Sequence, residues 1–277
     1  MLKIKPGKAL SPDLLMLIRA LDQAAKQLHI PYFVIGATAR DILIEHVHGL
    51  ETTRATRDID FAVAVSSWEA FSQLKEHLIG TGEFQAGEQS HRLTFGQGNG
   101  AYPLDLVPFD GVEHEGEIAW PPTGDFVMNV TGYREAHDSA LDVEIEPGFT
   151  VRVVSLPAMV ILKILAWNDR PDRDKHAADV LLILRNYHQT GQLDRLYDDD
   201  NIALLEKHGY DLEVAGAALL GRDARRDVAR ETRAQVTNVF ATEKMAEKFI
   251  GQMMRSQRVD RDRASLVFAA FMAQLPG

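Results

Sequence analysis

The hydrophobic pattern of this chain changes at Ser155, and that change constrains the possible fold more than any other feature. Before it, short apolar runs with a period of two alternate with segments of helical spacing; after it, nearly every segment has helical spacing. A length of 277 residues predicts about two domains. We therefore expect an α+β core with a mixed sheet over residues 1–154, followed by an all-helical C-terminal domain over residues 155–277.

Start and stop signals divide the first half into separate elements. Ser11 and Pro12 predict the start of the first helix, and Ser155 predicts a helix start in the same way at the beginning of the second half. The expected helices cover about 11–29, 37–48 and 68–79, and the expected strands cover 32–35, 58–65, 84–87, 91–95, 102–109, 141–146 and 150–154. A polar loop over 51–57 leads into the strand that begins at Asp58.

The charge of the chain limits the nucleic-acid roles it could have. A formal net charge of −10 and a pI of about 5.5 argue against a protein that coats nucleic acid by bulk electrostatics. Between Arg222 and Arg263, however, eleven Arg and Lys residues stand against seven Asp and Glu residues, a net charge of +4. This stretch is either a local basic surface or a solvated helix face with alternating charges.

The expected compartment follows from what the sequence lacks. There is no cysteine, which excludes disulfides and thiolate metal sites. No apolar run approaches the ~20 residues that a membrane-spanning helix needs, and the N-terminal lysines are not followed by the apolar stretch of a secretory signal. We expect a cytoplasmic protein with no membrane partner.

Two carboxylates on one strand are the first candidate site. Asp58 and Asp60 are two residues apart and therefore project from the same face, whereas Ile59 and Phe61 point into the core. Two ionised carboxylates side by side repel each other, and a divalent cation such as magnesium removes that conflict. The alternative is a solvent-exposed strand face that carries two acids.

A third acid, Asp105, lies between Leu104 and Leu106 in another expected strand. An acid in an otherwise apolar strand is costly to bury unless it is paired or bound to metal. Asp105 is therefore a further candidate metal ligand. The alternative is an acid that faces water on an edge strand.

A strand–glycine–helix turn precedes the two carboxylates. It reads Gly36-Ala37-Thr38-Ala39-Arg40-Asp41, and a helix that begins at glycine with small residues offers free backbone N–H groups to phosphates. The side chains of Thr38 and Arg40 could add donors, or Arg40 could instead pair with Asp41 or another acid.

These features together resemble the polymerase-β-type nucleotidyltransferase superfamily. Its pattern is a strand, a glycine turn that opens a helix, D-x-D on the next strand and a third Asp on a later strand. The turn also resembles that of the tRNA CCA-adding enzymes, except that Ala37 stands where many members have a second Gly or Ser. Alanine is small enough to preserve a close approach of phosphate to the turn.

The helical half is similar to the AbiEii/AbiGii-type toxin nucleotidyltransferases. Lys163 lies within an apolar helix segment, and a basic loop is followed by a helix start in which Lys175 precedes Asp179 by four residues. His176 replaces a frequent Asp. The resemblance covers about residues 30–185. From the residues alone, Lys163 could instead extend to water, and Asp179 could instead pair with Lys175.

The resemblance implies a magnesium-dependent nucleotidyltransferase with two metal ions and an NTP substrate. It makes residues 1–154 the nucleotidyltransferase core and residues 155–277 a helical domain that completes the nucleotide and acceptor cleft. Asp58, Asp60 and Asp105 would be the catalytic metal ligands, and Asp105 would help to ionise the acceptor hydroxyl. The nucleotide-binding residues would be Gly36, Ala37, Thr38, Arg40, Lys163 and Asp179.

The acceptor is left open by the sequence. Transfer of a nucleoside monophosphate to a macromolecule, either an RNA such as tRNA or a protein, is the expected function, and a toxin of this kind would have a cognate antitoxin as partner. Two alternatives are modification of a small hydroxylated molecule such as an aminoglycoside, and a non-catalytic nucleotide-binding module.

Overall fold

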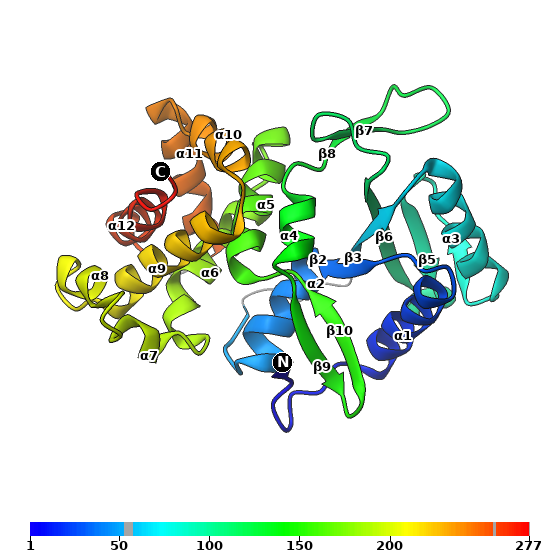
Figure 1. Ribbon diagram of the computed structural model, residues 1–277, viewed down its shortest axis with the longest axis horizontal. Helices are drawn as coiled ribbons and strands as arrows, with labels where there is room; N and C mark the ends of the chain where they lie inside the picture. Colours follow the sequence, from blue (N-terminus) through cyan, green and yellow to red (C-terminus); the bar gives the residue numbers. More distant parts are fainter. Residues whose placement is uncertain (53–57, 257–258, 277) are drawn as a thin grey trace. The chain divides into compact units, whose positions relative to one another are not determined.

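The computed structural model describes residues 1–52, 58–256 and 259–276, which form two compact units (Figure 1). The first unit contains residues 1–49 and the described residues from Asp58 to Val154. The second contains residues 50–52 and the described residues from Ser155 onward. Most of the polar loop expected over 51–57 lies outside the described residues.

A mixed eight-stranded sheet forms the centre of the first unit in the described part of the chain. Its strands, in spatial order, are β1 (Leu2–Lys3), β9 (Leu141–Glu146), β10 (Phe149–Val153), β2 (Tyr32–Ile35), β3 (Ile59–Val65), β6 (Tyr102–Asp110), β5 (Arg92–Phe95) and β4 (Phe84–Ala86). The pairs β1–β9, β10–β2 and β3–β6 are parallel and the others are antiparallel. This arrangement confirms the expected α+β class with a mixed sheet.

The parallel pair β3–β6 lies within the sheet and contributes buried apolar residues to the core. Phe61 of β3 lies opposite Leu106 of β6, and both are fully buried. Ile59 and Leu104 form the preceding pair and are also buried. Because side chains alternate between the two faces of a strand, the burial of these residues directs Asp60 to the opposite face.

Helices flank this sheet, and serine side chains start two of them. They are α1 (Pro12–Gln27), α2 (Gly36–Asp41), α3 (Trp68–Gly80) and α4 (Tyr133–Asp138). Ser11 Oγ accepts a hydrogen bond from the backbone N–H of Leu14 at 3.3 Å, and Ser67 Oγ caps α3 in the same way. Helices α1 and α3 pack against each other, and α3 also contacts β3 and β4 (Figure 1).

Several elements of the first unit differ from the sequence-based expectation. The helix after β2 changes at Ile42 into a π-helical segment, η1 (Ile42–Val47). Short elements that were not expected are β1, α4 and a separate two-stranded sheet of β7 (Glu117–Ala119) and β8 (Val127–Asn129). Strands of two or three residues are too short to show a period of two, so only their backbone partners in the folded chain define them.

The second unit is helical in its described residues. Its helices are α5 (Leu156–Asp169), α6 (Lys175–Asn186), α7 (Leu193–Leu196), α8 (Ile202–Lys207), α9 (Leu212–Asp227), α10 (Arg230–Val239), α11 (Glu243–Met253) and α12 (Arg261–Met272). It also contains the short 3₁₀ turns η3 (Tyr187–Gln189) and η4 (Met254–Ser256). A further 3₁₀ turn, η2 (Gly98–Gly100), belongs to the first unit. Ser155 caps α5, as expected. None of the described helices combines the length and the apolar character that crossing a bilayer requires.

Helix α9 lies at the centre of the second unit, where it contacts α5, α6 and α12. Two of its glycines allow this close packing. A Cβ on Gly216 would press on His188, and a Cβ on Gly221 would overlap the backbone of Phe271. Beside α9, the rings of Trp167, Phe249 and other aromatic residues form a core cluster, with 4.7 Å between those two ring centroids.

A buried carboxylate connects α9 to the segment before it. Asp223 is 3% exposed and accepts hydrogen bonds from Tyr187 Oη at 2.5 Å and from both terminal nitrogens of Arg195 at 2.7 and 2.8 Å. Burial alone would raise the pKa of Asp223, but the hydrogen bonds from Arg195 and Tyr187 lower it below its ordinary value. The carboxylate therefore stays ionised and holds η3, the α7 segment and α9 together.

We predict that Asp223→Ala lowers the free energy of unfolding by about 3 kcal/mol, because Arg195 and the Tyr187 hydroxyl lose their buried partner. Asp227→Ala is the matched control on the same helix. Asp227 pairs with the largely exposed Arg226, so its loss should cost less than about 1 kcal/mol. Urea unfolding of the two variants measures the difference, and equal losses would contradict a structural role for Asp223.

Candidate active site

Two of the three expected carboxylates lie side by side in the sheet. Asp60 of β3 is directly opposite Asp105 of β6 in the parallel register, and Arg92 of β5 is directly opposite Asp105 on its other side. Paired residues on neighbouring strands share a face, so the three side chains form a row across one face of the sheet. Asp58 comes two residues before Asp60, immediately before β3, and is exposed.

A guanidinium group lies among these carboxylates. Arg92 donates from Nε and Nη2 to the two oxygens of Asp105, both at 2.7 Å, which is the bidentate geometry of a strong ion pair. These hydrogen bonds are the main reason that the pKa of Arg92 is raised. The charges of Asp58 and Asp60 raise it further, so both act on the same guanidinium. His91 Nε2 lies 4.0 Å from Asp105.

The glycine turn lies directly against Asp60. Gly36 has a φ of +71°, and a Cβ at this position would overlap the carboxylate of Asp60. Ile35, the residue before it, is the register partner of Asp60. Thr38 Oγ1 donates to the backbone oxygen of Asp58 at 3.1 Å and holds the helix start against the beginning of β3. The turn and the D-x-D segment are thus one structural unit.

The two polar side chains of the turn have partners inside the protein. Thr38 is buried, and its hydroxyl bonds to Asp58 as described. Arg40 is 2% exposed and donates from Nε and Nη2 to Asp41 Oδ1 at 2.8 and 2.6 Å. The pairing of Arg40 with Asp41 was one of the alternatives from the sequence. Roles for Thr38, Arg40 and Ala37 in nucleotide binding stay predictions.

The two expected site residues of the helical unit bind each other. Lys163 of α5 donates from Nζ to Asp179 Oδ2 of α6 at 2.6 Å, and both side chains are buried. Lys163 therefore does not extend to water. Burial, followed by the charge of Lys163, lowers the pKa of the neighbouring His176 to about 3, so this imidazole is neutral.

No ready-made metal cage is present in residues 1–52, 58–256 and 259–276, where no three His, Asp or Glu side chains are grouped closely enough to hold an ion. The chemistry of the donors nevertheless suits magnesium, which prefers carboxylate oxygens. Both oxygens of Asp105 are bound to Arg92. A cation that used Asp105 would have to compete with that guanidinium.

Most of this chain matches the model of a known protein family. The family model described as nucleotidyl transferase AbiEii toxin, type IV TA system, matches residues 19–262. The chain belongs to the AbiEii family. It is a nucleotidyltransferase, and the resemblance stated from its sequence is confirmed. Among curated protein sequences there is no significant match.

Several solved structures are similar to this AbiEii family member at low identity. An antigenic nucleotidyltransferase-like protein from Paracoccidioides brasiliensis is 18% identical over 75% of this chain and 94% of that one, with a TM-score of 0.45. The antibiotic-resistance factor ANT(2'')-Ia is 19% identical over 73% and 100%, with a TM-score of 0.40. The Thermotoga maritima CCA-adding enzyme complexed with tRNA is 13% identical over 97% and 80%, with a TM-score of 0.26. The assignment rests on the family model and not on these scores.

Two residues beside the carboxylates of this AbiEii family member were not expected from the sequence. Arg92 faces Asp105 only because β5 and β6 pair in one particular antiparallel register. His91 is buried next to it, with its ring 5.5 Å from that of Trp120. The register of β5 and β6 could not be predicted from the sequence, because the length of the glycine-rich loop between them does not define the turn. If the register of this hairpin had been known, it would have identified Arg92 as the residue opposite Asp105.

We predict that Gly36→Ala reduces both nucleotidyl transfer and stability, because a methyl group would displace the Asp60 carboxylate. Gly82→Ala is the matched control, since Gly82 has a φ of +80° with nothing within 4 Å of its added Cβ. The control should lose only the cost of a positive φ, about 1 kcal/mol, and keep its activity. Urea unfolding and a transfer assay on both variants measure this. Equal behaviour of the two would contradict the importance of the close contact.

Proposed function

We propose that this protein transfers a nucleoside monophosphate from an NTP to a macromolecular acceptor, in a magnesium-dependent reaction, and that it is the toxin of a toxin–antitoxin pair. One observation carries the proposal: Gly36 lies against Asp60, which lies opposite Asp105, in a chain of the AbiEii family. The contact brings a helix start next to carboxylates, the combination that a triphosphate and its cation require.

Asp58, Asp60 and Asp105 would hold magnesium through their carboxylate oxygens. Magnesium, when bound, would neutralise charge on the triphosphate as nucleotidyl transfer proceeds. Arg92 would keep a role beside the metal site. Because its bidentate contact occupies both oxygens of Asp105, Arg92 would have to release at least one of them to the cation.

The reaction that we propose is an in-line displacement at the α-phosphorus of the NTP. The acceptor hydroxyl oxygen forms a new bond to that phosphorus, the bond from the α-phosphorus to the bridging oxygen breaks, and pyrophosphate leaves. Asp105 would accept the proton of the attacking hydroxyl. The turn from Gly36 to Arg40 would hold the β- and γ-phosphates, chiefly through the backbone N–H groups at the start of α2.

Lys163 and Asp179 belong to the proposal as nucleotide-binding residues. The support is their resemblance to family motifs and their buried 2.6 Å contact. Burying two charges together costs free energy that the pairing does not fully recover, which favours a role beyond stability. The domain roles are proposed in the same way: the first unit as the nucleotidyltransferase core, and the helical unit as the part that completes the nucleotide and acceptor cleft.

We predict that the purified protein, given labelled NTPs, magnesium, total RNA and a protein extract, places label in one macromolecular fraction. Asp60→Asn should lower transfer by about 100-fold or more, since metal binding is worth several kcal/mol. Asp142→Asn, at an exposed strand position of the same unit, is the matched control and should be active. Removal of magnesium by EDTA should abolish labelling.

The fraction that carries the label identifies the acceptor class. Label in RNA supports an RNA acceptor such as tRNA, and label in protein supports a protein acceptor. Label in neither fraction, from any of the four NTPs, would refute a macromolecular acceptor. Equal activity of the Asp60→Asn and Asp142→Asn variants would refute the assignment of the metal site.

We also predict that induced expression of the chain in a bacterial host stops growth, because uncontrolled nucleotidyl transfer would inactivate its acceptor. The Asp60→Asn variant should permit growth at the same expression level. Colony counts after induction, with protein levels measured by immunoblot, test this. Growth arrest by both the unaltered chain and the Asp60→Asn variant would show that the effect does not come from catalysis. Arrest by neither protein would argue against the toxin role and against a cognate antitoxin.

A further inference from the structure

A small pocket lies in the helical unit, between α10 and the C-terminal residues of the described chain. Its volume is about 260 Å³. The lining residues are Arg230, Arg233, Ala234, Thr237, Asn238, Leu275 and Pro276. Pockets for complete small-molecule ligands usually measure about 300–1,000 Å³, so this one suits a single chemical group of a larger ligand or a small ion.

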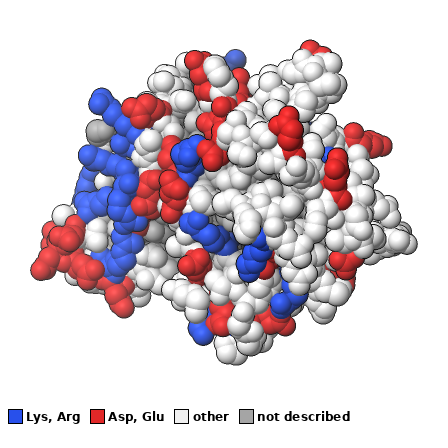
Figure 2. All heavy atoms as spheres, turned by 45° about the vertical axis from the view of Figure 1, so that its right-hand side comes forward, with Lys and Arg blue, Asp and Glu red and all other residues white. Residues whose placement is uncertain are grey.

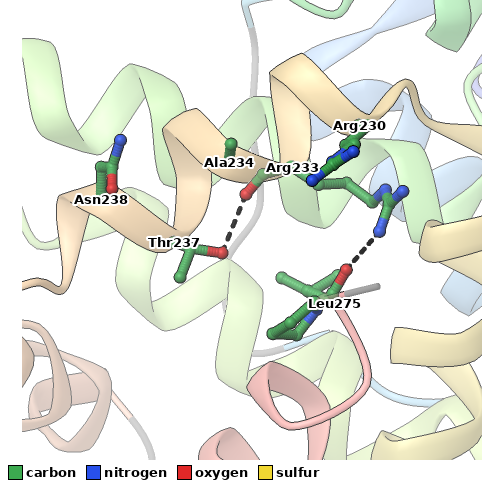
Figure 3. Close-up of a pocket in the computed structure, with 7 residues that line it drawn as sticks. Arg230, Arg233, Ala234, Thr237, Asn238 and Leu275 are labelled. Atoms are coloured by element: carbon green, nitrogen blue, oxygen red, sulfur yellow. Dashed lines mark hydrogen bonds between the residues drawn. The ribbon is translucent and has the colours of Figure 1, made fainter.

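Helix α10 presents its lining residues in one stripe. Arg230, Arg233, Ala234 and Thr237 are spaced as i, i+3, i+4 and i+7, which places them on the same face of the helix. Figure 3 shows the guanidinium groups of Arg230 and Arg233 at the same end of the pocket, beside Leu275, with Thr237 farther along α10.

Neither of the two arginines forms an ion pair with an acid among the described residues. Arg230 is exposed and has no hydrogen-bond or ion-pair partner among the described residues. Arg233 donates from Nε to the carbonyl oxygen of Val228 at 3.1 Å and from Nη1 to that of Leu275. Carbonyl oxygens fix the orientation of a guanidinium but carry no charge to neutralise it. Like charges three residues apart on a helix repel each other, and no Asp or Glu lines the pocket.

The end of α10 adds to this positive potential. Arg230 is the first residue of the helix, where the backbone dipole is also positive, and Ala229 before it provides no capping side chain. A cation at this position is unfavourable unless an anion is nearby. The acid in the first turn, Glu231, is exposed and is not among the residues that line the pocket.

Several other cations of the 222–263 segment are paired with acids, in contrast to these two. Arg263 pairs with Asp211 and Glu213, and Lys248 pairs with Asp172, so acids from outside the segment offset its net positive charge. In Figure 2, Lys and Arg side chains gather along the left edge of one face, with Asp and Glu beside them. Part of the segment therefore has the alternating charges that were one of the two alternatives from the sequence.

The geometry points to the pocket as a phosphate-binding site that takes a backbone phosphate of an RNA acceptor. The forked guanidinium groups match the oxygens of a phosphate, and Asn238 can donate a further hydrogen bond. Ala234, Leu275 and Pro276 would contact the adjoining sugar. The inference rests on the proposed function, which supplies the RNA acceptor. Free inorganic phosphate has the same chemistry as a backbone phosphate and would fit the same pocket.

We predict that Arg230→Gln weakens binding of a labelled tRNA to the full-length protein about tenfold, and lowers the salt dependence of binding by about one phosphate contact. Ala234→Leu should also weaken binding, since leucine fills the pocket without changing charge and favours the helix. Arg225→Gln is the matched control, because Arg225 is exposed and unpaired in the described chain but does not line the pocket. It should bind within about twofold of the unaltered protein.

The measurement is fluorescence anisotropy at several KCl concentrations without NTP, together with calorimetric titration of inorganic phosphate. Weaker tRNA binding by Arg230→Gln and Ala234→Leu alone supports an RNA phosphate. If only inorganic phosphate binding is lost in these two variants, the pocket holds free phosphate. Unchanged binding of both probes, or an equal loss in Arg225→Gln, would overturn the phosphate site. Thermal unfolding of each variant checks its fold, and a failure of nucleotidyl transfer would leave these binding results standing.

Discussion

The approach of the Asp60 carboxylate to the backbone of Gly36 is the contact on which the active-site geometry depends. It requires β2 and β3 to pair so that Ile35 faces Asp60, and it requires a residue without Cβ at a φ of +71°. A shift of one residue in this register would turn Asp60 into the core and Phe61 out of it. The burial of Phe61, Ile59 and their partners on β6 therefore fixes the position of the carboxylate as well as the stability of the sheet.

Charge compensation is the second constraint on this site. Several carboxylates near one another repel, and Arg92 supplies a positive charge beside them through two contacts with Asp105. In the helical unit, the charge of the acid Asp179 is compensated in a similar way by Lys163, and both side chains are buried. In both places one cation and one acid are in direct contact, so that the acid, which is largely buried, is not left unpaired.

The basic segment shows how little a charge count says about a surface. Its excess of arginine and lysine is balanced in three dimensions by acids such as Asp211 and Asp172, which lie far away in the sequence. Arg233 instead bonds to carbonyl oxygens, which hold it in place without neutralising it. An arginine of this kind can still bind an anion.

Local pattern determined much of this protein. The alternation of apolar residues predicted β2, β3, β5, β6 and the β9–β10 hairpin, and serine caps predicted the starts of α1 and α5, because these signals depend on neighbours within a few residues. The D-x-D spacing also predicted that Asp58 and Asp60 share one face, without any knowledge of the fold. Tertiary structure decided which partner each charged group has: Asp105 with Arg92, Lys163 with Asp179 and Arg40 with Asp41. The pairing of Asp105 with Arg92 depends on strand register, and that of Lys163 with Asp179 depends on helix packing. Arg40 had several possible acidic partners in the sequence. Only the packing of residues that are distant in the sequence determines which of these contacts forms.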